Sequence, residues 1–265
     1  MRRPRGRLVA IGAAALAGAL AMVLAQAPAS LLASALGRWG DGAVELGDAT
    51  GTVWNGQADL ILSGGDRGGT DAGPRVRLPG RLAWRIRPGQ LLLGTLDLRL
   101  EDAAILDAPV LLRMDRSGGA DLDANVLRLP ASVLVGLGAP WNTIRPGGDL
   151  RLEWDTVHLR AGTLRGQLRG EWTGASSTLS PVVPFGHYRL LANGIFDGAT
   201  LQLETVSGPM EMTGNGTIAG GMRLQFRGRA RVQSGTDPAI ATQLAGLISL
   251  LGRNDGDGAI LNFGT

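Results

Sequence analysis

Short stretches in which apolar and polar residues alternate recur along most of the chain. Residues 96–101 have the sequence LDLRLE, with leucine at every second position, and residues 150–154, 201–205 and 222–227 show the same period. A period of two points successive side chains to opposite faces of a strand, so one face of each segment is expected to be buried. Clean alternation favours an antiparallel sheet with one solvated face. The sequence therefore predicts an all-β fold: a mostly antiparallel curved sheet, or a partial barrel or sandwich.

Two segments have helical spacing instead. In residues 238–251 the apolar positions recur every three or four residues, Asp237 is placed to cap the first turn, and Pro238 suits the first helical position. Gly252 would allow a left-handed end. This C-terminal amphipathic helix is expected to cover the open face of the sheet. A shorter helix is predicted for residues 130–137.

Glycine separates the alternating segments. The chain has 42 glycines without a collagen-like period, which is typical of turns between strands. Residues 64–74, with the sequence GGDRGGTDAGP, contain nothing to bury, and we expect a loop there.

An uncharged apolar run near the N-terminus predicts a membrane anchor. Residues 8–25 would form a helix of about 27 Å, close to the hydrocarbon thickness of a bilayer. Four arginines precede the run, and basic flanks stay on the cytoplasmic side. We therefore expect a cytoplasmic tail at residues 1–7, one transmembrane helix at 8–28 and a periplasmic β-rich domain at 29–265. Cleavage of a signal peptide after Ala27 remains the alternative.

The charge balance argues against nucleic-acid binding. The chain has 26 basic residues, but four lie before the apolar run, which leaves 22 basic against 23 acidic residues in the exported part. A nearly neutral domain with 4% aromatic residues has neither the basic surface nor the stacking platforms that nucleic acids need. Cysteine is absent, which excludes disulfides and thiolate chemistry.

Two parts of the chain resemble each other. Residues 82–84 (LAW) lie ten residues before Gly94, and residues 152–154 (LEW) lie eight before Gly162; each group follows a Pro-Gly pair. The hypothesis is a duplicated β-meander, with halves at about 44–128 and 145–235, each covering the apolar face of the other. Chance similarity between leucine-rich strands is the alternative.

Several motifs in order resemble the protein N family of the bacterial type II secretion system. They are GTVWNG at 51–56, LAWRIRP at 82–88, RPG at 145–147, PFGHY at 184–188, SGPMEMTGNG at 207–216, FRGRA at 226–230 and LLG at 250–252 before Gly258.

The resemblance implies a single-pass inner-membrane protein of Gram-negative bacteria, with a periplasmic domain that is an accessory subunit of the machinery for protein export across the outer membrane. The implied partners are other inner-membrane and secretin components of the system. It implies no catalytic, cofactor-binding or metal-binding residues. The insertion at 64–74 departs from the family pattern.

No other motif predicts chemistry. His158 lies on an alternating strand and is expected to face water, and His187 is expected to hydrogen-bond locally; two histidines without spaced carboxylates do not predict zinc. Residues 214–219 (GNGTIA) match a dinucleotide fingerprint, but a strand follows where that motif requires a helix, so a hairpin is predicted. We therefore expect no catalytic, cofactor or metal residues, and no enzymatic activity.

The tryptophans are expected to have two roles. Four of them fall on or beside predicted strands and are expected to anchor the core with the indole N–H at its rim: Trp54, Trp84, Trp154 and Trp172. Trp39 and Trp141 lie in less regular sequence and are candidates for an exposed docking edge; Trp39 also suits the membrane interface.

Two functions remain after these exclusions. The first is a non-enzymatic scaffold of the type II secretion system that binds other subunits through sheet edges or loops. The alternative is a periplasmic lipid-handling β-domain of the cell envelope, in which an apolar sheet face holds an acyl chain. The sequence leaves open whether that face is filled by side chains or encloses a cavity.

Overall fold

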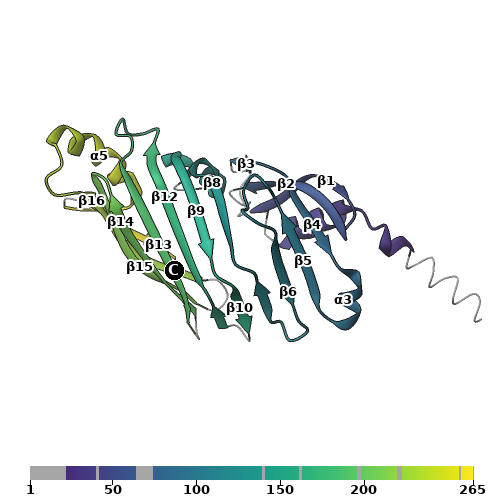
Figure 1. Cartoon of the computed structure of the whole chain (residues 1–265). Helices are drawn as coiled ribbons and strands as arrows, with labels where there is room; N and C mark the ends of the chain where they lie inside the picture. The colour runs from purple at the N-terminus through teal and green to yellow at the C-terminus, as the bar shows by residue number, and fades with distance from the viewer. Residues whose placement is uncertain are drawn as a thin grey trace, which may run out of the picture.

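Two nine-stranded antiparallel sheets make up most of the protein (Figure 1). The structure is a computed structural model, and it describes residues 22–39, 42–63, 74–138, 141–160, 163–195, 198–219, 223–256 and 258–264. The predicted all-β, mostly antiparallel class is confirmed, and neither sheet is closed.

The first sheet contains most of the N-terminal strands. Its order is β1-β2-β4-β5-β6-β7-β10-β11, with β3 paired to β2. The strands are β1 Val44–Gly51, β2 Asn55–Ser63, β3 Arg75–Arg77, β4 Leu82–Ile86, β5 Leu96–Glu101, β6 Val110–Met114, β7 Ala120–Leu122, β10 Val157–Arg160 and β11 Thr163–Arg165.

The second sheet contains the longer, C-terminal strands. Its order is β17-β18-β16-β15-β14-β13-β12-β9-β8. The strands are β8 Asn125–Pro130, β9 Pro146–Trp154, β12 Gln167–Ser177, β13 Gly186–Ile195, β14 Gly198–Ser207, β15 Met210–Ala219, β16 Arg223–Val232, β17 Arg253–Asp255 and β18 Gly258–Phe263.

Three lengths of chain run from one sheet into the other. β7 is followed by β8 after two residues, β9 by β10 after two residues, and β11 by β12 after Gly166 alone. Gly166 has a φ of 147°, which a residue with a side chain rarely adopts, and its carbonyl accepts from the amide of Gly194 at 2.9 Å. The sheets are therefore joined by bent strands rather than by a flexible linker.

Alternation along the strands separates a charged outer face from an apolar inner face. On β16, Phe226 and Ala230 are buried, while Arg231 on the other face pairs with Glu211 of β15 at 2.9 Å. In the same way Arg189 of β13 pairs with Glu204 of β14 at 3.1 Å. Because the strand period is two, these cross-strand ion pairs fix which face of the second sheet is apolar.

The predicted C-terminal helix is confirmed as α5, Pro238–Leu251. Asp237 caps it by accepting from the amide of Ala239 at 2.7 Å, and Leu244 and Leu247 are fully buried. The predicted left-handed exit at Gly252 is wrong: its φ is −175°, because the chain continues directly into β17 in extended backbone.

The other helices are short. Residues 130–137 were predicted as a helix, and the structure has the 3₁₀ helix η1 at Ala131–Leu137. Three α-helices were not predicted: α2 Ala29–Trp39, α3 Pro88–Leu93 and α4 Trp141–Ile144. Local signals for α3 were present in the sequence, since Pro88 occupies its first turn and Gly94 after it has a φ of 80°.

Two predicted segments fall largely outside the described residues. Of the predicted membrane segment, residues 8–21 lie outside, and residues 22–25 are helical. Within the described ranges no helix is both long and apolar enough to cross a bilayer, so the anchor stays a prediction. The predicted loop at 64–74 lies outside them except for Pro74.

A buried carboxylate holds one edge of the first sheet together. The side chain of Asp59 on β2 is 2% exposed and forms an ion pair with Arg77 on β3. Its other oxygen, Oδ1, lies 3.7 Å from Nε of Arg81 and has no hydrogen-bond partner among the described residues. Burying a carboxylate is costly unless cations remain beside it, so Asp59 depends on Arg77.

We expect Arg77→Ala to lower the free energy of unfolding by about 2 kcal/mol, because it leaves a buried carboxylate with one distant cation. Arg75→Ala is the matched control: Arg75 lies on the same strand, its side chain is also 60% exposed, and the side chain of its partner Glu45 is 32% exposed. Loss of that surface pair should cost less than about 1 kcal/mol. Urea unfolding measures both, and equal losses would contradict the role of Asp59.

Candidate functional site

The inner face of the second sheet carries a continuous apolar surface. Strand register places Leu152, Gly170, Leu190 and Leu203 side by side in one row across β9, β12, β13 and β14. The next row along the same strands consists of Trp154, Leu168, Ala192 and Leu201. Residues directly opposite one another in antiparallel strands share a face, so both rows face inward.

Two cavities lie along this face. The first has a volume of about 210 Å³ and is bounded by the first row and by α5. The second, of about 300 Å³, lies around the second row, next to Leu122 of β7 and Val157 of β10 where the sheets join. We call the two cavities together the furrow. The leucines of β12–β14 that line it, including Leu168, Leu190 and Leu203, are only partly buried.

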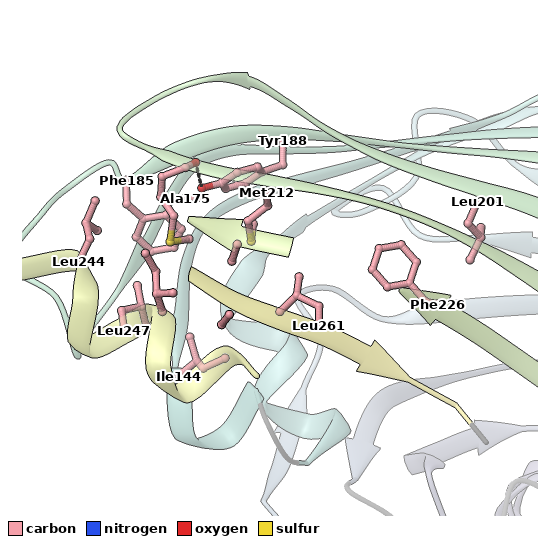
Figure 2. Close-up of a cluster of buried hydrophobic side chains, with 14 of the residues drawn as sticks. Ile144, Ala175, Phe185, Tyr188, Leu201, Met212, Phe226, Leu244, Leu247 and Leu261 are labelled. Atoms are coloured by element: carbon pink, nitrogen blue, oxygen red, sulfur yellow. Dashed lines mark hydrogen bonds between the residues drawn. The ribbon is translucent and has the colours of Figure 1, made fainter. Parts of the chain in front are cut away.

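Aromatic side chains that pack against one another form the wall of the first cavity at one end of the furrow. The ring of Trp172 meets that of Phe185 edge-on, with centroids 5.7 Å apart, and Tyr188 lies 5.7 Å from Trp172. Figure 2 shows Leu244 and Leu247 of α5 beside Phe185 at this end, with Phe226 and Leu201 farther along the sheet. α5 therefore covers part of the inner face, as predicted, and leaves the rest uncovered.

Three polar side-chain groups of the lining donate to backbone carbonyls. The hydroxyl of Tyr188 donates to the carbonyl of Met210 at 2.9 Å, the indole N–H of Trp172 donates to Gly147 at 2.9 Å, and that of Trp154 donates to Asp123 at 2.9 Å. Glu171 borders the first cavity, but its carboxylate pairs with Arg189 on the outer face. These groups therefore offer a ligand no free donor or charge.

Burial raises the pKa of the Tyr188 phenol above its ordinary value. The folded state therefore favours the neutral phenol. Its contribution to the free energy of unfolding is complete below pH 10, near the pKa of the phenol in the unfolded chain, and is lost as the pH rises toward the pKa in the folded protein.

Each of the two histidines has a hydrogen-bonding neighbour. His158 is exposed, as predicted, and its Nδ1 lies 2.6 Å from Asp121, which Arg160 also binds through both oxygens. Hydrogen bonds from Arg160 and His158 lower the pKa of Asp121. Nδ1 of His187 accepts from the amide of Gly174 at 3.2 Å. Among the described residues no group of three potential ligands could hold a metal.

The four tryptophans predicted as core anchors all donate their indole N–H to a backbone carbonyl, but only Trp84 is buried and the other three are half-buried. The indole N–H of Trp84, which is buried, donates to Val53 at 3.0 Å, and that of Trp54 donates to Leu24 at 2.7 Å. The prediction for Trp141 as an exposed docking residue is wrong, because it is half-buried and lines the first cavity. The side chain of Trp39 lies outside the described residues.

The segment that matches a dinucleotide fingerprint is part of a strand. The predicted hairpin is confirmed: Gly214 and Gly216 lie inside β15, which pairs antiparallel with the next strand, β16. The ring of Phe226 occupies the space where a side chain on Gly214 or Gly216 would lie. These glycines therefore make room for an aromatic ring, and no helix follows to bind a phosphate.

Sequence reasoning identified the apolar face but not the furrow. A cavity depends on which residues oppose one another across strands, and the leucine pattern alone does not give register. One signal was available: Gly170 follows Leu168 at the next inward position of β12 and leaves a gap between Leu152 and Leu190 of the neighbouring strands.

Alkaline titration tests whether the packed end of the furrow is dry. Tyr188 is the only tyrosine of the chain, so absorbance of phenolate near 295 nm reports this residue alone. We expect no ionisation in the folded protein at pH 11 and a normal titration near pH 10 in urea. Titration near pH 10 in the folded protein would show that water reaches the phenol.

The comparisons with known proteins agree with the motifs in the sequence. A family model described as type II secretion system (T2SS), protein N matches residues 42–261. No curated protein and no solved structure matches the chain. The matched region runs from just before β1 into β18 and so includes both sheets and α5. The chain belongs to the type II secretion system protein N family.

Proposed function

We propose that this component of the type II secretion system is a non-enzymatic accessory subunit, anchored in the inner membrane with its β-domain in the periplasm as a scaffold. The observation that carries the proposal is the family match across residues 42–261. The apolar run at residues 8–25 supports the anchor, and the four preceding arginines support a cytoplasmic N-terminus.

Exposed apolar residues gather at the end of the β-domain where the apolar run joins it. Leu24 accepts a hydrogen bond from the indole of Trp54, and the carbonyl of Trp54 accepts from the amide of Ile86 at 2.7 Å. α3 begins two residues later, and its Leu92 and Leu93 are 85% and 71% exposed. Figure 1 shows α3 at the same end of the molecule as the N-terminal helices. Met22, Val23 and Leu24 are also exposed.

Arginines beside α3 fit the same orientation. Arg87 precedes the helix with a side chain that is largely exposed, and Arg116 donates to the carbonyl of Leu92 at 3.4 Å. Arginine can lay its alkyl stem on apolar surface and keep its charge among lipid headgroups. We therefore infer that this end of the β-domain rests on the bilayer, with the leucines of α3 at the hydrocarbon boundary.

Fluorescence quenching tests this orientation. The chain has no cysteine, so Leu92→Cys gives a single labelling site for an environment-sensitive dye in the full chain in vesicles. We expect quenching by lipids with a spin label on the acyl chain to be at least threefold stronger at residue 92 than at Val206→Cys. Val206 is an exposed apolar residue of β14 and serves as the control. Equal quenching would contradict contact between α3 and the membrane.

The β1 edge of the first sheet is the proposed docking surface for another subunit; α2 packs Ala29 and Leu32 against the apolar side of β1. β1 ends the strand order and pairs only with β2, so the other side of its backbone has no strand partner among the described residues. The register shifts between Gly47 and Thr50, where Asp48 has a φ of 47°. Unpaired edges can add a strand from a partner, and the bulge limits that addition to residues 44–47.

Photocrosslinking in secreting cells tests the scaffold role. With benzoylphenylalanine at Glu45 of β1, inside the segment that can add a strand, we expect crosslinks to another type II subunit. At Gln225 they should be absent, because β16 is paired on both sides. The proposal fails if no secretion subunit is recovered from either position, or if deletion of the gene leaves secretion intact.

A further inference from the structure

We propose that the furrow of the second sheet binds one hydrocarbon chain of a lipid. This inference goes beyond the role in secretion and depends on the shape and lining of the two cavities, about 210 and 300 Å³ in volume.

The lining is apolar surface that the protein itself does not cover. Where α5 packs on the sheet, its own Leu244 and Leu247 are at most 1% exposed. Leu168, Leu190 and Leu203 on the inner face of the sheet are only partly buried. Covering apolar surface is worth about 25 cal/mol for each Å². An apolar ligand that covers this surface would therefore stabilise the folded protein. At the packed end, α5 already covers the apolar surface.

The two cavities follow one another along the same strands. On β13, Tyr188 and Leu190 line the first cavity, and Ala192 and Gly194 line the second. The six residue-to-residue steps from Tyr188 to Gly194 span about 20 Å of strand. One acyl chain spans about 15 Å, half of a bilayer's hydrocarbon core of about 30 Å. The furrow is thus long enough to hold a single extended chain.

Gly170 provides depth at the middle of the furrow. It lies between Leu152 and Leu190 in the inward row, and a Cβ built there would lie 3.2 Å from Cδ2 of Leu152. A side chain larger than alanine at this position would project into the first cavity. The gap in the leucine row therefore belongs to the binding surface rather than to a turn, since Gly170 lies inside β12.

The chemistry of the lining favours hydrocarbon over water or peptide. Water in a cavity needs two to four polar partners, and apolar cavities of about 150 Å³ stay dry and accept small hydrocarbons. An extended peptide would bring N–H and C=O groups that need partners. Tyr188, Trp172 and Trp154 already donate to backbone carbonyls. A hydrocarbon chain needs no hydrogen-bond partner, and the polar headgroup of the lipid would stay outside the furrow.

Photocrosslinking of lipid tests the inference with the full chain in vesicles of phosphatidylethanolamine and phosphatidylglycerol. One arm uses palmitic acid with a diazirine on its chain; the other uses phosphatidylethanolamine with the same group on one acyl chain. We expect crosslinks on inward residues of β12–β14, at least fivefold reduced by excess unlabelled lipid of the same kind. Labelling by the fatty acid alone would identify a free fatty acid, and labelling by both would identify a chain that can remain esterified.

Adjacent leucines of β13 provide the matched variants. Leu190→Phe fills the first cavity and should reduce crosslinking at least fivefold, whereas Leu191→Phe lies on the outer face beside Arg169 and Gln202 and should leave it within twofold. If Leu190→Phe does not fold, Leu168→Phe narrows the second cavity in its place. As a second measurement, palmitate should raise the Tm of the wild-type protein and of Leu191→Phe but not that of Leu190→Phe.

Three results would overturn the inference. They are crosslinks confined to residues 8–25, equal crosslinking in Leu190→Phe and Leu191→Phe, and a peptide segment held in the furrow that excess palmitate does not displace. Secretion is measured separately in the same variants. If lipid does not bind but secretion is intact, only the inference of lipid binding is contradicted. If secretion fails but lipid binds, the inference of lipid binding still holds.

Discussion

The structure depends on backbone hydrogen bonding along one bent hairpin. β9 and β12 pair in the second sheet, and their continuations β10 and β11 pair in the first. The amide of Asp155 donates to Gln167 at 3.1 Å in the bend between them, so pairing continues through the junction. Because the same two lengths of chain belong to both sheets, the curvature of one sheet fixes the position of the other sheet. The second cavity lies at this junction and owes its shape to it.

Charge and hydrophobicity are divided between faces rather than between regions of the sequence. On the outer face of the second sheet, Arg189, Arg231 and their glutamate partners form cross-strand pairs. On the inner face the same strands present leucine, methionine and aromatic side chains. A one-residue slip in register would bury these arginines, which is far more costly than the loss of any one pair. The alternation of charged and apolar residues therefore specifies the strand register and the buried face of the sheet, independently of how individual side chains pack.

Part of this architecture follows from the sequence and part does not. Alternation predicted β5, β9, β14 and β16, and the cap at Asp237 predicted α5, because both signals are local. The extended backbone of Gly252 was missed because it depends on pairing between β17 and β18, which the residues around the glycine do not reveal. α3 was missed because six residues show too little of a helical period. The duplication of two halves stays a prediction, although the indoles of Trp84 and Trp154 each donate to a carbonyl 31 residues earlier.

The lengths of chain that pass from one sheet into the other also determine where the protein could be cut into fragments. A cut between β9 and β10, or at Gly166, would separate residues that are nearly continuous in extended backbone and expose new unpaired strand ends on each fragment. Neither sheet contains a contiguous set of strands, since β8 and β9 interrupt the first and β10 and β11 interrupt the second. The chain therefore has no single boundary at which one sheet could be separated from the other as an independent module.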